Sequence, residues 1–538
     1  MTMNPVDPFT VEVVRNALTA IAEEMSVVVM RSARSPLLRE AGDLSSALTS
    51  ATGELIAQGR DIPVHMGVMA ATVKEFLKRV PAEQLAPGDV WFLNLPEVGG
   101  NHLPDVKAIR PVYVDGRLEA FAVSLAHWAD IGGARPGSYV PDATDAWQEG
   151  LRIPPLRVFT DEGTDREKLD VILANLRGAP EREGDILAQM AATRTADQRL
   201  VELISRHGGD TVRACIAALH DQSEAQMCAA LEAITDGVYE GHDQLDDDGA
   251  GGPPASVRVR LTIAGDEATF DFSETDDAVP GPLNTTRFST AASVFYAIKA
   301  AAGPEIQPNA GCYRPLTIIT RPGSLLDPPV ESPVVGGNHE TTQRVADAIF
   351  LALEAVIPER LTAGGPTTSG LLLFSGRHPR DGRWTTFYET HGGGEGARID
   401  RDGAPVVRVH MSNVMNTPAE VVETEYPLCV VRHALRRGSG GAGAHRGGDG
   451  MVREYRITGD QVGLTTMFER RVIPPYGLQG GEAGEPFRVT LIRANGESEE
   501  LSGKTHVRLV RDDRIILESC GGGGYGPPGS DNTGGDSS

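Results

Sequence analysis

Two histidines and an aspartate between residues 102 and 127 have the types and spacing of a metal site. His102 and Asp105 occur in the run Asn-His-Leu-Pro-Asp, and His127 occurs in Ala-His-Trp-Ala-Asp. Two imidazoles and a carboxylate suit zinc, manganese, iron or nickel. Three protein ligands that leave one coordination position open are what hydrolysis by a metal-bound water requires. We therefore predict a divalent metal site at these three residues.

A predicted β-hairpin would bring the three residues together. Two apolar runs, 106–114 and 117–126, are joined by Asp-Gly, a strong hairpin signal because both turn positions favour positive φ. Pro111 lies inside the first run and indicates an edge position or a bulge. An unbroken register from the turn places His127 opposite Pro104, between His102 and Asp105.

Three further residues are candidates for the same site. Asp130 and Asp43 could each supply a fourth ligand, a general base or an acceptor that orients an imidazole. His65 is close in sequence to a second predicted hairpin, 43–59, and could line the pocket. The spacing alone does not choose between Asp43 and Asp130.

The elements around these residues predict an α+β, multi-domain protein. Apolar residues at three- and four-residue steps predict helices over 8–34 and 66–79, and residues 90–93 form a short predicted strand. We expect a mixed α/β metal-site region at 1–140, a mainly helical region at 141–250 that breaks at Gly208-Gly209, and a β-rich region at 251–526. Helices at 289–302 and 341–357 interrupt the last region, and 527–538 is expected to be a disordered tail.

The composition excludes several classes of protein. A formal net charge of -24 repels nucleic acid phosphates and anionic membranes, so we expect neither as a partner. The five cysteines are scattered and never form a Cys-x-x-Cys pair, which fits a reducing cytoplasm. No signal peptide or apolar run of membrane-spanning length is visible. The chain has no phosphate-binding Gly-x-x-x-x-Gly-Lys motif, and we interpret Gly521 to Gly524 as a tight turn.

Many motifs in a fixed order resemble the hydantoinase B/oxoprolinase family, over roughly residues 7–527. They are DPFTVEVVRNAL (7–18), GGNHLPDV (99–106), AHWADIGGARPGS (126–138), GPLNTT (281–286), PNAGCYRPL (308–316), ETTQRVADAI (340–349), NTPAEVVETEYPL (416–428), GSGGAGAHRGGDG (438–450), ERRVIPPYGLQGG (469–481) and CGGGGYGPP (520–528). The family includes N-methylhydantoinase B subunits, the second half of 5-oxoprolinases, and subunits of acetone and acetophenone carboxylases.

The resemblance implies a function and a ligand set. Its metal ligands fall on Asp43, His102, Asp105 and His127, which favours Asp43 over Asp130. It implies a hetero-oligomer in which an A-type, hydantoinase A-like ATPase subunit uses ATP to phosphorylate a cyclic amide, and this subunit then hydrolyses it at a zinc, manganese or iron ion. The alternatives are a subunit of an ATP-dependent ketone carboxylase and a non-catalytic assembly subunit.

This chain departs from the family pattern beside the expected ligands. It has Leu95 and Glu97 where the family has Asp and Tyr, and Trp128 where the family has a second His. The four ligand positions themselves are retained. These departures put the identity of the substrate in doubt more than metal binding, and they keep the assembly-subunit alternative open.

Overall fold

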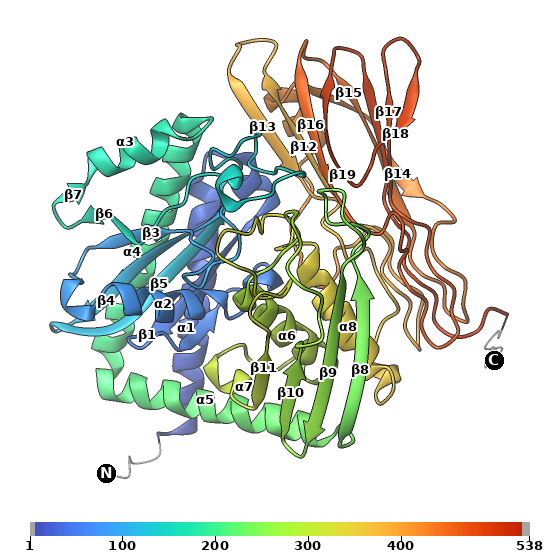
Figure 1. Ribbon diagram of the computed structural model, residues 1–538. Helices are drawn as coiled ribbons and strands as arrows, with labels where there is room; N and C mark the ends of the chain where they lie inside the picture. The colour runs from blue at the N-terminus through green and yellow to red at the C-terminus, as the bar shows by residue number, and fades with distance from the viewer. Residues whose placement is uncertain (1–5, 530–538) are drawn as a thin grey trace, which may run out of the picture.

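A seven-stranded antiparallel sheet occupies the N-terminal part of the computed structural model, which describes residues 6–529 (Figure 1). Its order is β2-β1-β5-β4-β3-β6-β7. The strands are β1 (Leu44–Ser50), β2 (Leu55–Gln58), β3 (Val90–Leu93), β4 (Asp105–Val114), β5 (Arg117–His127), β6 (Leu156–Thr160) and β7 (Gly163–Thr164). The predicted hairpins and the strand at 90–93 are confirmed.

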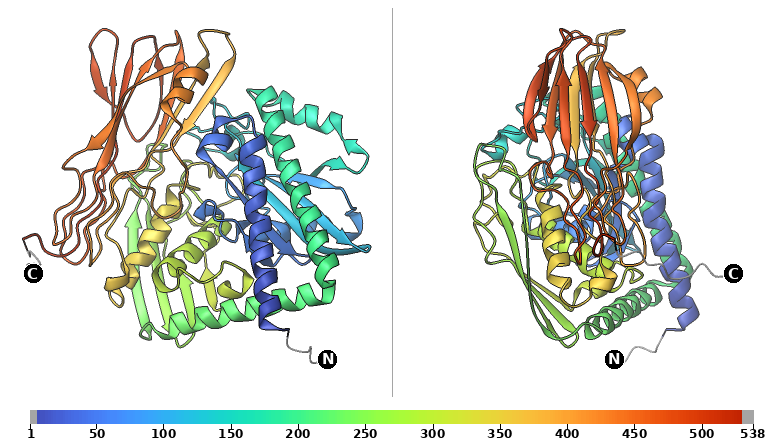
Figure 2. Two further views of the ribbon diagram at one scale, coloured as in Figure 1. Left: turned by 180° about the vertical axis from the view of Figure 1, so that it is seen from behind. Right: turned by 90° about the vertical axis from the view of Figure 1, so that its right-hand side faces the viewer.

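Helices cover both faces of this sheet, so its side chains alternate between two apolar layers. Helices α1 (Pro8–Ser32) and α4 (Ala179–His207) lie side by side on one face, where they pack on Val106, Ala108 and Ala122 (Figure 2). Helix α2 (Val68–Arg79) packs on the other face against Ile109 and Val123. This period-two alternation decides which residues at the strand ends share a face.

A helical segment connects the first sheet to the second. After α3 (Arg166–Ala174) and α4, the chain breaks at Gly208, where φ is +83°, and continues as α5 (Gly209–Glu232). The break predicted at Gly208-Gly209 is therefore confirmed. Figure 2 shows α5 crossing beneath α1 and α4 toward the second sheet.

The second sheet has four strands in the order β11-β10-β9-β8. Helices α6 and α8 pack against it in a shared apolar core. The elements are β8 (Gly237–Gln244), β9 (Ser256–Ala264), β10 (Glu267–Asp271), α6 (Arg287–Ala302), α7 (Ala310–Tyr313), β11 (Leu316–Ile319) and α8 (Thr341–Leu353). The helices predicted at 289–302 and 341–357 correspond to α6 and α8.

Two further sheets form a C-terminal sandwich around one apolar core (Figures 1 and 2). Their orders are β13-β12-β16-β19 and β14-β15-β20-β17-β18. The elements are β12 (Leu371–Arg377), β13 (Trp384–Glu389), α9 (Ala419–Glu425), β14 (Leu428–Arg436), β15 (Gly450–Ile457), β16 (Val462–Met467), β17 (Arg488–Ile492), β18 (Ser498–Glu500), β19 (Lys504–Leu509) and β20 (Arg514–Glu518).

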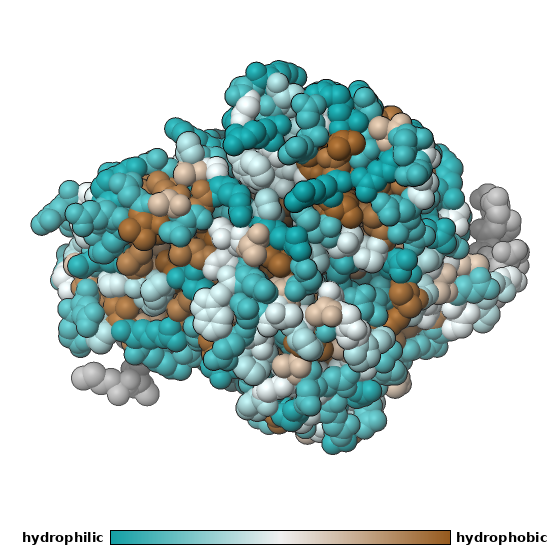
Figure 3. Space-filling view, turned by 45° about the horizontal axis from the view of Figure 1, so that its top comes forward, coloured by the Kyte–Doolittle hydropathy of each residue, from teal (hydrophilic) through white to brown (hydrophobic). Residues whose placement is uncertain are grey.

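Short helical turns complete the described elements. They are the π-helix η1 (Leu37–Ala41) and the 3₁₀ turns η2 (Pro63–His65), η3 (Ala82–Gln84), η4 (Ala146–Glu149) and η5 (Pro358–Arg360). Within residues 6–529 there is no helix whose length and apolar character would suit a membrane crossing. Figure 3 shows apolar patches separated by hydrophilic surface.

Glycine-rich segments below the sandwich pack backbone against backbone. A Cβ on Gly394 would lie 1.8 Å from the carbonyl oxygen of Gly448, and one on Gly522 would lie 1.9 Å from that of Glu395. Gly522 N–H donates to Gly448, and Gly441 N–H donates to Gly522. Gly521 to Gly524 thus form an extended segment that packs against the backbone near Glu395, Gly441 and Gly448. The predicted tight turn is wrong.

Other local predictions also need correction. Residues 406–410 lie in the region expected to be β-rich but form a loop, because Val406 and His410 have φ of +54° and cannot continue a ladder. Strands β6, β7 and β8 lie inside the stretch 141–250, which was expected to be mainly helical. Of the tail expected at 527–538, residues 530–538 lie outside the described residues.

Candidate metal centre

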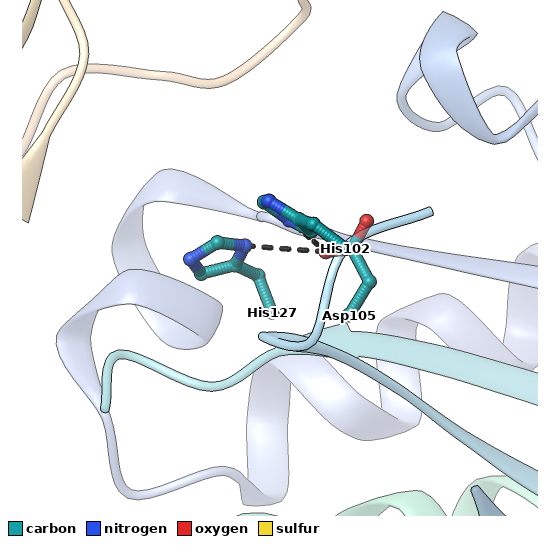
Figure 4. Close-up of side chains that lie close together, drawn as sticks. All are labelled: His102, Asp105 and His127. Carbon is teal, nitrogen blue, oxygen red and sulfur yellow. Dashed lines mark hydrogen bonds and ion pairs between the residues drawn. The ribbon is translucent and has the colours of Figure 1, made fainter. Parts of the chain in front are cut away.

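The predicted trio converges at the end of the long hairpin. Asp105 begins β4, His127 ends β5, and the two residues are direct cross-strand partners. His102 lies in the turn before β4, where its carbonyl accepts the N–H of Asp105 at 3.1 Å. One ligand-type atom from each of the three side chains lies within 4.8 Å of the others, and the side chains face one another (Figure 4).

The register differs by one residue from the prediction. Val114 pairs with Arg117 as expected, but Val112 pairs with Ala120, so Glu119 is the extra residue of a β-bulge. The Glu119 carboxylate accepts hydrogen bonds from Arg213 of α5, which holds the bulge. His127 therefore pairs with Asp105, and the predicted pairing with Pro104 is wrong.

Both imidazoles have a buried nitrogen that has no hydrogen-bond partner. His102 and His127 are 1% and 2% exposed, and their Nε2 atoms make no hydrogen bond of good geometry among the described residues. His102 Nε2 and His127 Nδ1 both lie beside Asp105 Oδ1, at 3.1 and 3.2 Å. His102 Nδ1 lies 3.1 Å from the carbonyl oxygen of Val335. A carbonyl only accepts, so this contact places the proton on Nδ1 and leaves the Nε2 lone pair available. The donor set and these free nitrogens fit a divalent metal.

Burial and the facing charges favour the ligand-competent protonation states. Burial lowers the pKa of His102, which favours its neutral form. Burial also opposes ionisation of Asp105, but His102 and His65 outweigh it and hold the pKa of Asp105 well below its usual range. A neutral imidazole beside a carboxylate is the state that coordinates a cation.

His65 and Asp43 each contact a member of the trio. His65 Nε2 lies 3.2 Å from Asp105 Oδ2, and its Nδ1 lies 2.8 Å from the Ser45 hydroxyl. These contacts orient the Asp105 carboxylate. Asp43 follows the π-helix η1, its carbonyl accepts the N–H of His127 at 3.1 Å, and its Oδ2 lies 4.0 Å from His127 Nδ1. A π-helix beside a site is a recurrent functional feature.

The Asp130 carboxylate forms hydrogen bonds within the loop that follows β5. Its two carboxylate oxygens accept the N–H groups of Gly132 and Gly137 at 2.7 Å. Arg177 also lies 3.2 Å from Asp130 Oδ2. These bonds satisfy the carboxylate without any contact to His102, Asp105 or His127 among the described residues.

The unusual residues beside the trio point elsewhere. Trp128 is fully buried on the α4 side of the sheet and donates from Nε1 to Gln189 at 3.0 Å. Leu95 packs in the apolar layer under α2. Glu97 forms an ion pair with Arg152 at 2.8 Å. The departures from the family pattern therefore belong to packing and surface contacts.

Three aromatic side chains near the trio were not predicted from the sequence. The ring centroid of Tyr388 lies 4.7 Å from that of His127, and Tyr139 lies 6.1 Å from His102. His339 lies 5.3 Å from Tyr139. Burial raises the pKa of Tyr139 and of Tyr388 well above the usual value, so both hydroxyls remain protonated. Tyr139 follows the 126–138 motif directly, which was an available signal.

Other reactive side chains are engaged elsewhere. His391 lies between the Gly370 carbonyl oxygen, 2.8 Å from Nδ1, and the Tyr455 hydroxyl, 3.1 Å from Nε2. Burial raises the pKa of Cys312 to about 11 and that of Cys520 to about 12, which disfavours the thiolate. These groups have the partners and protonation states of structural residues.

Known proteins are similar to this chain over almost its whole length. The chain is 33% identical over 536 residues to the caprolactamase subunit beta of Pseudomonas jessenii, covering 98% of this chain and 92% of that protein. It is 32% identical to the 5-oxoprolinase of Dictyostelium discoideum, but it spans only 40% of that protein.

Solved structures show the same fold. The crystal structure of the ATP-dependent caprolactamase from Pseudomonas jessenii matches with a TM-score of 0.91 and 32% identity, over 97% of this chain and 92% of that chain. An acetone carboxylase matches with a TM-score of 0.88 at 18% identity, over 97% of this chain and 76% of that chain. The Hydantoinase B/oxoprolinase family model matches residues 7–528, and the chain belongs to that family.

Proposed function

We propose that this chain is the metal-binding subunit of an ATP-dependent enzyme that hydrolyses an amide bond in a small ring, such as a hydantoin, 5-oxoproline or a lactam. One observation carries the proposal: one ligand-type atom from each of His102, Asp105 and His127 lies within 4.8 Å of the others in a buried site. The similarity to a caprolactamase subunit and to 5-oxoprolinases supports the choice of a cyclic amide.

The proposed ligands are Asp43, His102, Asp105 and His127. These residues would hold a zinc, manganese or iron ion, which would supply a Lewis acid for hydrolysis. His65 holds the Asp105 carboxylate, and the Val335 carbonyl fixes the tautomer of His102. These contacts position the ligands before the substrate arrives.

Tyr139 and Tyr388 are proposed to stabilise the charge that develops on the substrate oxygen. Their hydroxyl oxygens lie 3.4 Å apart, and both rings contact the imidazole of His127. Because burial keeps both phenols protonated, each can donate a hydrogen bond to an oxyanion. Asp130 has no proposed role in the chemistry.

An A-type ATPase subunit is the proposed partner. It would use ATP to phosphorylate the amide oxygen, and this chain would receive the activated ring. Two observations support a second subunit: the Pseudomonas relative is itself named as a beta subunit, and the 5-oxoprolinases are more than twice as long as the part that this chain matches.

Metal analysis of the purified chain tests the site. We expect about one divalent ion per chain in the wild type and less than a tenth of that in a His102→Ala/His127→Ala variant, since both imidazole ligands are lost. His433→Ala/His445→Ala is the matched control and should retain the metal. Substoichiometric metal that is the same in all three proteins would contradict the proposal and favour the assembly-subunit alternative.

Activity assays test the dependence on a partner. The isolated chain should neither hydrolyse ATP nor open rings. Together with the A-type subunit it should consume ATP with hydantoin, 5-oxoproline or a lactam, whereas consumption only with acetone and bicarbonate would establish the carboxylase alternative. ATP hydrolysis by the isolated chain would refute the two-subunit assignment.

A further inference from the structure

A hollow of about 360 Å³ carries an excess of positive charge in this acidic protein. Arg360, Arg398 and Arg408 line it together with His410, and Glu395 is the only carboxylate among its lining residues. We call it the arginine hollow. In four other surface hollows of the described residues, carboxylates equal or outnumber guanidinium groups. The arginine hollow is therefore the one of these five hollows whose lining carries a net positive charge.

The arginines of the arginine hollow have few direct ion-pair partners among the described residues. Arg398 and Arg408 form no ion pair within residues 6–529, and Arg360 is only 4.0 Å from the exposed Glu359. Arg408 donates to the carbonyls of Thr390 and Val414, but its buried Nη1 has no hydrogen-bond partner in the described part of the chain. A guanidinium nitrogen left without an acceptor is costly unless a ligand supplies one.

The loop that carries Arg408 is held in an unusual conformation. Val406 and His410 both have φ of +54°, a region that β-branched and bulky residues rarely occupy. His410 is fixed on both sides, with Nε2 3.2 Å from Asp347 and Nδ1 3.3 Å from the Tyr296 hydroxyl. Strain of this kind is typical of ligand-binding segments.

The arginine hollow also adjoins the candidate metal centre. Pro63 lines it and belongs to η2, the turn that carries His65. Val64 N–H donates to the carbonyl of Met411 at 3.3 Å, so the loop after Arg408 lies against η2. Burial lowers the pKa of Arg408 to about 10, and the negative charges of Glu389 and Asp43 offset part of that lowering. A ligand in the hollow would therefore lie close to the metal ligands.

We propose that the arginine hollow binds a phosphate group, either on an organic phosphoester or as inorganic phosphate. Several guanidinium groups around one cavity match the geometry and charge of a phosphate oxyanion. The proposal rests on the proposed function, since phosphate would arrive on an activated substrate or leave after hydrolysis. Binding itself requires neither the partner nor the metal.

Isothermal titration of the full chain in a phosphate-free buffer tests the proposal. Two probes are used, inorganic phosphate and phenyl phosphate, and each should displace the other because they share one site. Tighter binding of phenyl phosphate identifies the phosphoester as the occupant, and equal or tighter binding of inorganic phosphate identifies the free anion. Absence of binding by both probes overturns the proposal.

Three substitutions locate the binding. Arg408→Gln and Arg398→Gln should each weaken phosphate binding at least tenfold, because each removes one cation from the hollow. Arg398→Gln is informative even if Arg408→Gln fails to fold, since the Arg398 side chain has no hydrogen bond or ion pair to lose within residues 6–529. Arg287→Gln is the control. It removes the same charge from a different hollow, one with more carboxylates than guanidinium groups, and should bind phosphate as tightly as the wild type does.

Metal content is measured on the same samples. Loss of phosphate binding with the metal retained supports the arginine hollow as a separate site. Unchanged binding in Arg398→Gln overturns the assignment while leaving the metal centre intact. A chain without metal that still binds phosphate through Arg398 contradicts the proposed function and supports the phosphate site.

Discussion

Glu149 is a buried carboxyl group that is linked to His102 through one residue. It is 0% exposed, and its Oε1 accepts the N–H of Val335 at 2.7 Å. The Val335 carbonyl in turn contacts His102 Nδ1. Glu149 Oε2 has no partner within residues 6–529, and burial raises the pKa of Glu149 from 4.5 to about 8. The side chain is therefore mostly protonated at neutral pH.

This raised pKa makes the stability of the protein depend on pH. Between pH 4.5 and about 8, the folded protein holds a proton that the unfolded chain has released, so the free energy of unfolding falls as pH rises. One pKa unit corresponds to about 1.4 kcal/mol, which gives a loss of about 2 kcal/mol between pH 6 and pH 8. Above the folded-state pKa, the loss levels off.

Urea unfolding of Glu149→Gln tests this reasoning. The amide keeps the acceptor for Val335 but cannot ionise, so the variant should gain about 2 kcal/mol relative to the wild type from pH 6 to pH 8. A chelator is present throughout, so that metal binding does not add its own pH dependence. Glu83→Gln on the exposed turn η3 is the control. Parallel curves for Glu149→Gln and the wild type would refute a neutral carboxyl group at this position.

Two further substitutions test packing. Trp128→Phe removes the donor to Gln189 and should lower the free energy of unfolding in urea by about 1–3 kcal/mol. Its metal content should stay at the wild-type level. Loss of metal would show that Trp128 belongs to the metal centre. Gly394→Ala places a methyl group against the Gly448 carbonyl and should cost at least about 3 kcal/mol. Gly496→Ala, where φ is +92° and no atom lies within 4 Å, should cost only about 1–2 kcal/mol. Equal costs at the two glycines would contradict tight backbone packing.

The sequence predicted the elements whose signals are local. The apolar periodicity of α1, the Asp-Gly turn between β4 and β5, and the break at Gly208 each depend on neighbouring residues, and the structure confirms them. The convergence of His102, Asp105 and His127 followed from the same hairpin. The bulge at Glu119 did not, because an ion pair with the distant Arg213 holds it; Pro111 indicated only that a bulge was possible.

Contacts between residues far apart in the chain could not be predicted from the sequence. Tyr388 and His339 come from strands and loops more than 200 residues after the trio, and no local pattern shows which way they face. The glycine segments form no regular helix or strand, and their order arises only when several of them pack together. Arg408 likewise acquires its neighbours from separate parts of the chain.

The bulge at Glu119 makes the residue count of β5 more important than its composition. Between the turn and His127, a deletion of one residue would turn every later side chain to the opposite face and point the imidazole toward α4. Apolar residues within β5 can be exchanged for one another without moving that imidazole. Relatives that retain the metal should therefore vary in residue type along this strand while preserving its length.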